Sequence, residues 1–221
     1  MQMQNNMITS WDDGSVFDLK IAELLDRYKI SAIFYIPIIN HEREVMTKSQ
    51  IRQIAYKFEV GGHTYSHVDL TTVSQKKAFD EVLKGKKELE DIIGKKINKF
   101  CFPKGRYNKN VVGVVKKAGF KSARTSRIFC IDNNYGGFLE NPNLHVYNHM
   151  LITYLASCVK NKDLKSFLSA LRIKRVGFSN VASQFYRQGF HIWGHSWEVE
   201  EKVLWKDLKN FLSKLSKFNY N

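Results

Sequence analysis

Ser10-Trp11-Asp12-Asp13-Gly14 is the stretch of this sequence that decides the fold. It ends an apolar run that begins at Met7, and it places two adjacent carboxylates directly before a glycine. This pattern predicts a strand over about residues 7–11 that presents charge at its carboxyl end, where ligands collect in α/β folds. Paired acids there can divide the work, since one can bind a cation while the other handles a proton. The alternative is that Asp13 caps a helix that begins near Val16.

Outward from this stretch, short β-rich runs alternate with amphipathic helical runs, as in a parallel sheet covered by helices. Further strands are expected at about residues 31–36, 58–60, 99–102, 120–125, 144–147 and 189–195. Helices are expected at about 17–28, 49–58, 74–93, 109–118, 151–160, 164–171, 176–187 and 200–218. The rest of 128–148 has weak periodicity and reads as an irregular loop. The succession predicts an α/β fold, a distorted (β/α) barrel of about seven strands that is similar to a TIM barrel.

The composition favours one globular domain over residues 1–221. The chain has 221 residues, 43% of them hydrophobic, with only 3 prolines and no Ser/Gly-rich linker. A net charge of +14 would attract nucleic acid, an anionic membrane surface or an acidic glycan. The lysines are dispersed along helical runs without a nucleic-acid motif, so we expect solvated helix faces and no nucleic-acid partner.

Cysteine usage and the N-terminus indicate a cytoplasmic protein, although a mature secreted form stays open. Cys101, Cys130 and Cys158 are widely spaced and suggest neither a metal pair nor a disulfide framework. Residues 1–6 are polar and lack the apolar core of a signal peptide. The least charged stretch, 141–159, is interrupted by proline, histidine and asparagine, so no transmembrane segment is expected. The oligomeric state is not predicted.

Two further clusters fall where predicted strands end. His63 and His67 are four residues apart, a spacing that lets both imidazoles reach a single ion. Two histidines with one carboxylate are a common facial set for a divalent metal with open positions. His195 ends the last predicted strand. Ordinary polar packing is the alternative for each cluster taken alone.

Taken in order, these residues resemble the polysaccharide deacetylases of the carbohydrate esterase family 4 type, which share the NodB (chitooligosaccharide-deacetylase) homology domain. Residues 10–14 resemble its Thr-Phe-Asp-Asp-Gly motif, and 30–35 resemble its Val-x-Ala-Thr-Phe-Phe strand. Residues 62–67 are similar to its His-Thr-x-x-His motif, and Gly194-His195 is similar to its final Leu-x-His motif. The likeness covers about 6–125 and 189–198. It leaves 126–175 as a divergent region, expected to be an insertion or a lid.

The resemblance implies a metal-dependent hydrolase that removes the acetyl group of an N-acetylated sugar. Asp13, His63 and His67 would hold one divalent ion, zinc in the first place, with cobalt, nickel or manganese as alternatives. Asp12 would be the general base for the attacking water, whose pKa a metal lowers towards about 7. His195 would be the general acid that protonates the leaving amine, since histidine titrates in a suitable range.

Two departures from the family pattern stand out. Cys101 occupies the position of an arginine that orients the base, so Arg106 or Arg124 could supply the missing guanidinium, or nothing does. Cys101 itself is expected to be a buried structural thiol. The family's Asp- and Trp-containing fourth motif is not found. The candidates to orient His195 in its place are Asp132, Arg124 and Glu198.

Other residues allow weaker predictions. Aromatic faces can stack on sugar rings, so the candidate substrate contacts are Trp11, Tyr65, Pro103 and Trp197, with plain packing as the alternative. Surface or structural roles are expected for the remaining loop histidines, His41, His145 and His149, and a core position for His191.

The resemblance specifies the reaction more narrowly than the substrate. An oligosaccharide or a lipid- or nucleotide-linked sugar is expected, and the positive charge would suit an anionic carrier. The alternatives are an amide hydrolase acting on a non-sugar molecule, and a catalytically inactive glycan-binding relative, which the missing arginine keeps open.

Overall fold

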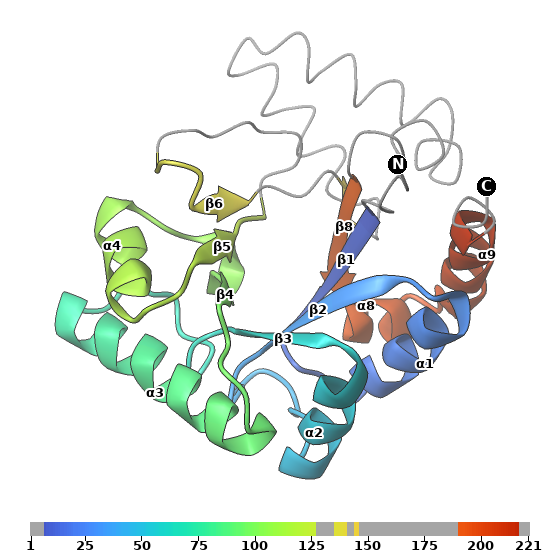
Figure 1. Ribbon diagram of the computed structural model, residues 1–221, viewed down its shortest axis with the longest axis horizontal. Helices are drawn as coiled ribbons and strands as arrows, with labels where there is room; N and C mark the ends of the chain where they lie inside the picture. Colours follow the sequence, from blue (N-terminus) through green and yellow to red (C-terminus); the bar gives the residue numbers. More distant parts are fainter. Residues whose placement is uncertain (1–6, 127–134, 141–143, 146–189, 217–221) are drawn as a thin grey trace, which may run out of the picture.

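The fold is one curled parallel sheet with helices along its outer side (Figure 1), in a computed structural model that describes residues 7–126, 135–140, 144–145 and 190–216. The strand order is β6-β5-β4-β3-β2-β1-β8-β7, and all neighbouring strands are parallel. The strands are β1 (Met7–Asp12), β2 (Ser31–Ile36), β3 (Glu59–Gly62), β4 (Lys99–Cys101), β5 (Ser122–Arg124), β6 (Leu139–Glu140), β7 (Leu144–His145) and β8 (Phe190–His195). The predicted distorted (β/α) barrel is confirmed.

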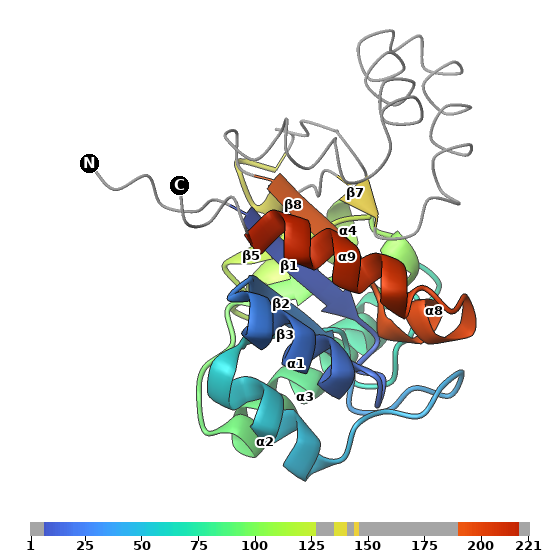
Figure 2. The same ribbon diagram turned by 90° about the vertical axis from the view of Figure 1, so that its right-hand side faces the viewer.

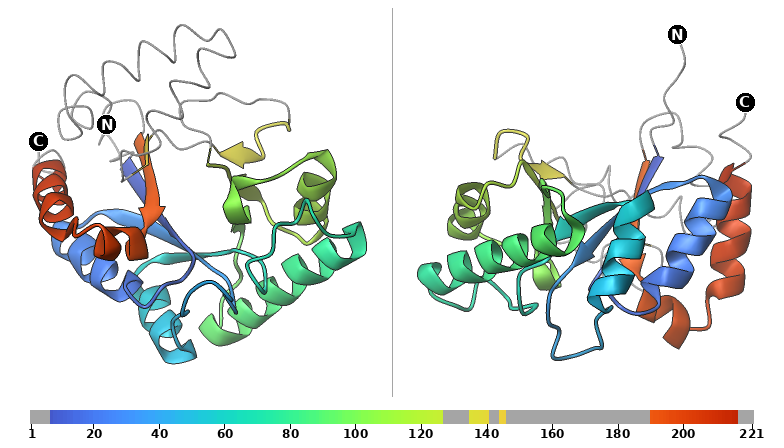
Figure 3. Two further views of the ribbon diagram at one scale, coloured as in Figure 1. Left: turned by 180° about the vertical axis from the view of Figure 1, so that it is seen from behind. Right: turned by 60° about the horizontal axis from the view of Figure 1, so that its bottom comes forward.

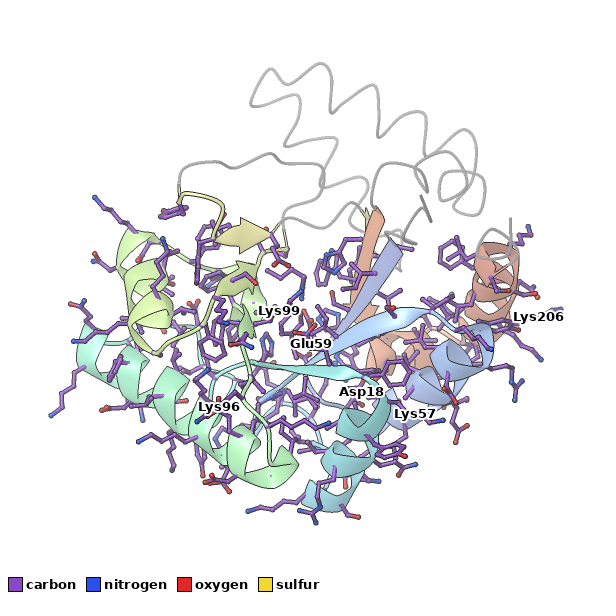
Figure 4. The ribbon with its side chains drawn as sticks, in the orientation of Figure 1. Asp18, Lys57, Glu59, Lys96, Lys99 and Lys206 are labelled. Atoms are coloured by element: carbon purple, nitrogen blue, oxygen red, sulfur yellow. The ribbon has the colours of Figure 1, made fainter. Side chains whose placement is uncertain are left out.

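Helices cover the outer side of the sheet. They are α1 (Asp18–Tyr28), α2 (Lys48–Lys57), α3 (Gln75–Ile93), α4 (Lys109–Lys117), α8 (Ser196–Glu201) and α9 (Trp205–Ser216), with a 3-10 turn η1 (Pro103–Gly105) after β4. Figure 2 shows α1 and α9 side by side. Long side chains project outward from the helices (Figure 4), as expected for solvated faces. None of the helices in the described ranges is long and apolar enough to cross a membrane.

The core explains why β2 reads as an unbroken apolar run. Phe34 and Ile36 pack with residues of α1 and α2 in the main apolar cluster. Ile33 and Tyr35, which alternate with them, form a second cluster with Cys101. A strand of a parallel sheet that is buried on both faces loses the alternation of polar and apolar residues.

Two sequence predictions need correction. The helix expected over 200–218 is two helices, because Val203 adopts a left-handed backbone (φ 55°) between α8 and α9. A left-handed β-branched residue is incompatible with a continuous right-handed helix. In addition, β6 lies inside the loop expected over most of 128–148.

The remaining predictions for the divergent region are not addressed by the described residues. The helices expected at 151–160, 164–171 and 176–187 lie outside them, as do Cys130, Asp132, His149 and Cys158. Most of residues 126–175 also lie outside the described ranges. The single domain over residues 1–221, with a divergent insertion or lid at 126–175, therefore stays a prediction.

Asp18, at the start of α1 (Figure 4), gives a testable dependence of stability on pH. Its side chain is fully buried, and burial raises its pKa well above the ordinary value, outweighing the opposing contact with Ser196. The folded state therefore holds this proton more tightly than the unfolded state, and the free energy of unfolding contributed here falls as pH rises above about 3.9. We expect Asp18→Asn to increase the free energy of unfolding at neutral pH by about 1 kcal/mol or more.

Urea unfolding at about pH 4 and about pH 7 measures this effect. The gain of Asp18→Asn over the wild type should be small at the lower pH and larger at the higher one. Asp26→Asn, on the exposed side of α1 in an ion pair with Lys57, is the matched control. An equal gain at both pH values would contradict a buried, proton-holding Asp18.

Candidate active site

The strand register brings the predicted site residues to one edge of the sheet. Asp12 is the register partner of His195 on β8 and of Tyr35 on β2. From behind, β1 and β8 lie side by side (Figure 3). Because parallel strands end at the same edge, Asp12 and His195 face one pocket together with Asp13, which follows Asp12 in the chain.

Asp13 is held in a tight left-handed turn directly after β1. Its φ is 75° and that of Gly14 is 63°. A Cβ on Gly14 would lie 2.8 Å from the Cγ2 atom of Ile36, so glycine is required there for space as well as for conformation. The cap residue of α1 is Phe17, which makes no side-chain capping bond, so the helix-cap alternative for Asp13 is wrong.

The carboxylate of Asp13 lies between two imidazoles. Its Oδ1 atom is 3.3 Å from Nε2 of His63 and 3.1 Å from Nε2 of His67. Its Oδ2 atom accepts a 2.9 Å hydrogen bond from the indole of Trp197. Burial raises the pKa of Asp13, but the hydrogen bonds from His63 and His67 lower it more, so the pKa is well below its ordinary value.

The loop after β3 presents the two histidines. Thr64 and His67 both adopt left-handed backbones, with φ of 67° and 53°. Gly85 of α3 packs so closely that a Cβ there would lie 2.6 Å from the backbone of Thr64. The buried carboxylate of Glu81, also on α3, accepts bonds of 2.9 Å from both the amide and the hydroxyl of Ser66. Helix α3 therefore fixes the loop that carries both histidines.

The geometry of Asp13, His63 and His67 fits a divalent metal ion. One ligand atom from each lies within 4.8 Å of those of the other two. Ligands about 2.0–2.1 Å from a tetrahedral zinc ion lie about 3.3–3.4 Å from one another, close to the spacings around Asp13. The Nδ1 of His63 donates to the carbonyl of Cys101 at 2.8 Å, which leaves Nε2, the atom that faces Asp13, as the one that could bind an ion.

The guanidinium missing from position 101 comes from the neighbouring strand. Cys101 on β4 is the register partner of Arg124 on β5. Arg124 is fully buried, and its Nη2 donates to Oδ2 of Asp12 and lies 2.9 Å from the sulfur of Cys101. Arg106, the other candidate, instead pairs with Asp69 at 2.9 Å, and its side chain is 65% exposed. Of the two candidates, only Arg124 contacts Asp12.

The environment of Asp12 keeps it ionised although it is buried. Burial raises its pKa, but the charges of Arg124 and then His63 lower it more, leaving the pKa below its ordinary value. The arginine is itself enclosed, since its guanidinium carbon lies 4.7 Å from the ring centre of Trp193. Cys101 is buried as expected, and burial raises the pKa of its thiol well above the ordinary value.

Glu198 is the candidate that contacts His195. The Nδ1 of His195 donates to Oε2 of Glu198 at 2.9 Å, while its Nε2 lies 3.9 Å from Oδ2 of Asp13. Burial lowers the pKa of His195, but the Glu198 hydrogen bond and the charge of Asp13 raise it more, so the pKa lies above its ordinary value. Among the three candidates for this contact, Arg124 lies against Asp12 and Asp132 is outside the described residues. In the sequence, Glu198 follows His195 by three residues, across the junction of β8 and α8, and this spacing is the signal that points to the contact.

The four candidate substrate contacts do not line the described pocket of about 280 Å³ around Asp12. Trp11 is 1% exposed in the core, and Pro103 is also buried. Lys84 lies 3.6 Å over the ring of Tyr65. Trp197 has Arg43 over its ring at 3.3 Å and holds Asp13 through its indole. Side chains that the sequence did not single out line the pocket instead, among them Glu42, Phe102, Lys104 and Trp193.

The histidines expected to be structural differ in their surroundings. His41 is exposed, whereas His191 is buried with its Nε2 2.8 Å from the hydroxyl of Ser10. His145 does not lie on the surface: it is 2% exposed, packs edge-on against Trp193 at 4.3 Å, and lies beside Glu198. Sequence reasoning missed this residue because β7 is only two residues long and has no periodic pattern.

A family model described as polysaccharide deacetylase matches residues 3–123. The chain belongs to the polysaccharide deacetylase family. Its members are carbohydrate deacetylases, which are hydrolases of amide bonds. The matched residues include the carboxylate pair of β1 and the histidine loop, whereas His195 lies beyond the match.

The chain is also similar to individual proteins, one by sequence and others by their solved structures. The chain is 27% identical over 115 residues to a peptidoglycan-N-acetylglucosamine deacetylase of Bacillus cereus, which covers 51% of this chain and 53% of that protein. It therefore spans about half the length of this curated relative. The chitin deacetylase of the fungal pathogen Colletotrichum lindemuthianum has a TM-score of 0.61 at 19% identity, covering 96% of this chain and 84% of that one. A family 4 carbohydrate esterase from Streptomyces lividans in complex with acetate has a TM-score of 0.59 at 15% identity, covering 97% and 87%. These structural likenesses show a shared fold.

Proposed function

We propose that this chain hydrolyses the acetamido group of an N-acetylated sugar, giving the free amine and acetate. The observation that carries this proposal is the convergence of Asp12 and His195 on the pocket that Asp13 and its two histidines also line. Amide hydrolysis needs a base for water and an acid for a poor leaving group. The lowered pKa of Asp12 favours its proton-accepting form, and the raised pKa of His195 favours its proton-donating form.

The ligands proposed for a divalent metal are Asp13, His63 and His67. Zinc suits this set of two imidazoles and one carboxylate, and cobalt, nickel and manganese are the alternatives. When bound, such an ion polarises the amide carbonyl and makes water more acidic. Trp197, which donates to Oδ2 of Asp13, keeps Oδ1 turned towards the histidines.

The proton steps are proposed for the chain's own residues. Asp12 takes a proton from the attacking water, and Arg124 holds that carboxylate ionised and in position. His195 gives a proton to the leaving nitrogen, so the amine departs neutral. Glu198 accepts from Nδ1 of His195 and thereby aims Nε2 into the pocket. Arg124 and Glu198 are thus positioning residues for the base and the acid.

N-acetylglucosamine in an oligosaccharide is the substrate we propose first. The name of the Bacillus cereus relative supports this sugar, and Phe102 and Trp193 give the pocket apolar surface against which a sugar ring could pack. A lipid- or nucleotide-linked sugar on an anionic carrier is the variant that the positive net charge supports. The cytoplasmic location stays a prediction from the sequence.

Removal of the metal tests the proposal. We expect acetate release from N-acetylglucosamine oligomers to be lost after the full chain is stripped with a chelator, and to return with zinc or cobalt. Non-sugar acetamides serve as the comparison substrates. Turnover of those alone would favour a non-sugar amide hydrolase. An ion bound at Asp13, His63 and His67 without turnover of any substrate would indicate an inactive binding relative.

A further inference from the structure

A second cluster of metal-ligating side chains lies behind His195. It consists of His145 on β7, His195 on β8 and Glu198 on α8, and one ligand atom from each lies within 4.8 Å of the others. The Oε2 atom of Glu198 is 2.9 Å from Nδ1 of His195 and 3.2 Å from Nε2 of His145. One carboxylate oxygen therefore lies between two imidazoles, the same arrangement that Asp13 makes with its own two histidines.

The local structure holds this cluster in place. His145 is the register partner of Trp193, two residues before His195 on β8, so both imidazoles point to the same side of the sheet. The side chains of His145 and Glu198 are 2% and 9% exposed, and that of His195 is 19% exposed. His195 also lines the pocket of the candidate active site, so the cluster and the active site share this imidazole.

We propose that His145, His195 and Glu198 form a second divalent-cation site, distinct from that of Asp13, His63 and His67 and suited to zinc. Two imidazoles and a carboxylate are borderline ligands that favour zinc over magnesium or calcium. The spacings of 2.9 and 3.2 Å need only a small expansion to reach the roughly 3.3–3.4 Å expected around a tetrahedral zinc ion.

Binding at this site conflicts with the role proposed for His195. Its Nδ1 faces Glu198 and its Nε2 faces Asp13, so a single imidazole separates the two sites. An ion bound to Nδ1 replaces the hydrogen bond from His195 to Glu198. The second ion is therefore inhibitory, a consequence that rests on the proposed deacetylase function, whereas the binding itself does not.

Zinc stoichiometry tests the site without any assay of activity. The metal-stripped full chain is dialysed against increasing zinc, and the bound metal is measured by elemental analysis. We expect two zinc ions per chain for the wild type, one for His145→Asn and one for Asp13→Asn. His41→Asn, which removes an exposed histidine, should still bind two. Circular dichroism of each variant checks that it is folded.

A folded His145→Asn chain that still binds two zinc ions would overturn the proposal, as would a wild-type chain that binds only one. Glu198→Gln is the second variant, and it should also lose one ion and no more. Where acetate release is measurable, excess zinc should inhibit the wild type, and His145→Asn should need at least about tenfold more zinc for the same fractional inhibition. Two bound ions without acetate release would reject the proposed function and leave the second site standing.

Discussion

Asp12→Asn is expected to lower kcat for acetate release by about 10³-fold or more while the metal content of the chain stays unchanged. A positioned general base contributes roughly 10²–10⁴-fold, and asparagine cannot accept the proton. Its amide oxygen can still accept the hydrogen bond that Arg124 gives to Oδ2 of Asp12, so the shape of the pocket should persist. Acetate release and metal content are measured on the same preparation.

Asp13→Asn is the matched variant on the next residue. It should lose both turnover and the ion held with His63 and His67, because Oδ1 of Asp13 is the atom that faces these two histidines. A competing arrangement exists, since Asp12, His63 and Cys101 also bring ligand atoms within 4.8 Å of one another. If Asp12→Asn loses its metal as well, Asp12 belongs to the ligand set. If it retains full activity, it is not the base.

The site residues that could be predicted lie within short, local sequence patterns. Asp12 and Asp13 close an apolar run, and His63 and His67 share a single tight loop, so neither required knowledge of how distant strands pair. The parallel sheet then places such strand ends together in any member of this architecture. The same rule identified His195, which ends β8 after an apolar run.

The parts that could not be predicted depend on register and backbone strain. Arg124 is 23 residues from Cys101, and only the pairing of β4 with β5 makes them lateral neighbours. His145 lies on a two-residue strand and contacts Glu198 from the far edge of the sheet. The left-handed Val203 ends α8 early at a residue type that rarely adopts such a backbone. None of these features leaves a periodic signal in the sequence.

Arg124→Met is expected to lower kcat by about 10²-fold, the upper range for loss of a residue that orients a functional group. Without the guanidinium, Asp12 stays buried but loses the charge that lowers its pKa. Its pKa should therefore rise, and the rising limb of the pH–rate profile should move to higher pH. Removing one partner of a buried ion pair also costs about 3–5 kcal/mol in stability, so unfolding is measured alongside the pH profile.

Rescue separates positioning of Asp12 from general loss of structure. Adding Cys101→Arg to Arg124→Met moves the guanidinium one strand across at the same level of the sheet, because the two positions are register partners. We expect this double variant to recover at least about tenfold in kcat over Arg124→Met and to return the pH profile towards that of the wild type. Arg106→Met is the matched comparison, and its kcat should stay within about twofold of the wild type because Arg106 pairs with Asp69 and does not contact Asp12. A double variant that folds but recovers neither kcat nor the pH profile would mean that Arg124 supports the fold and does not position the base.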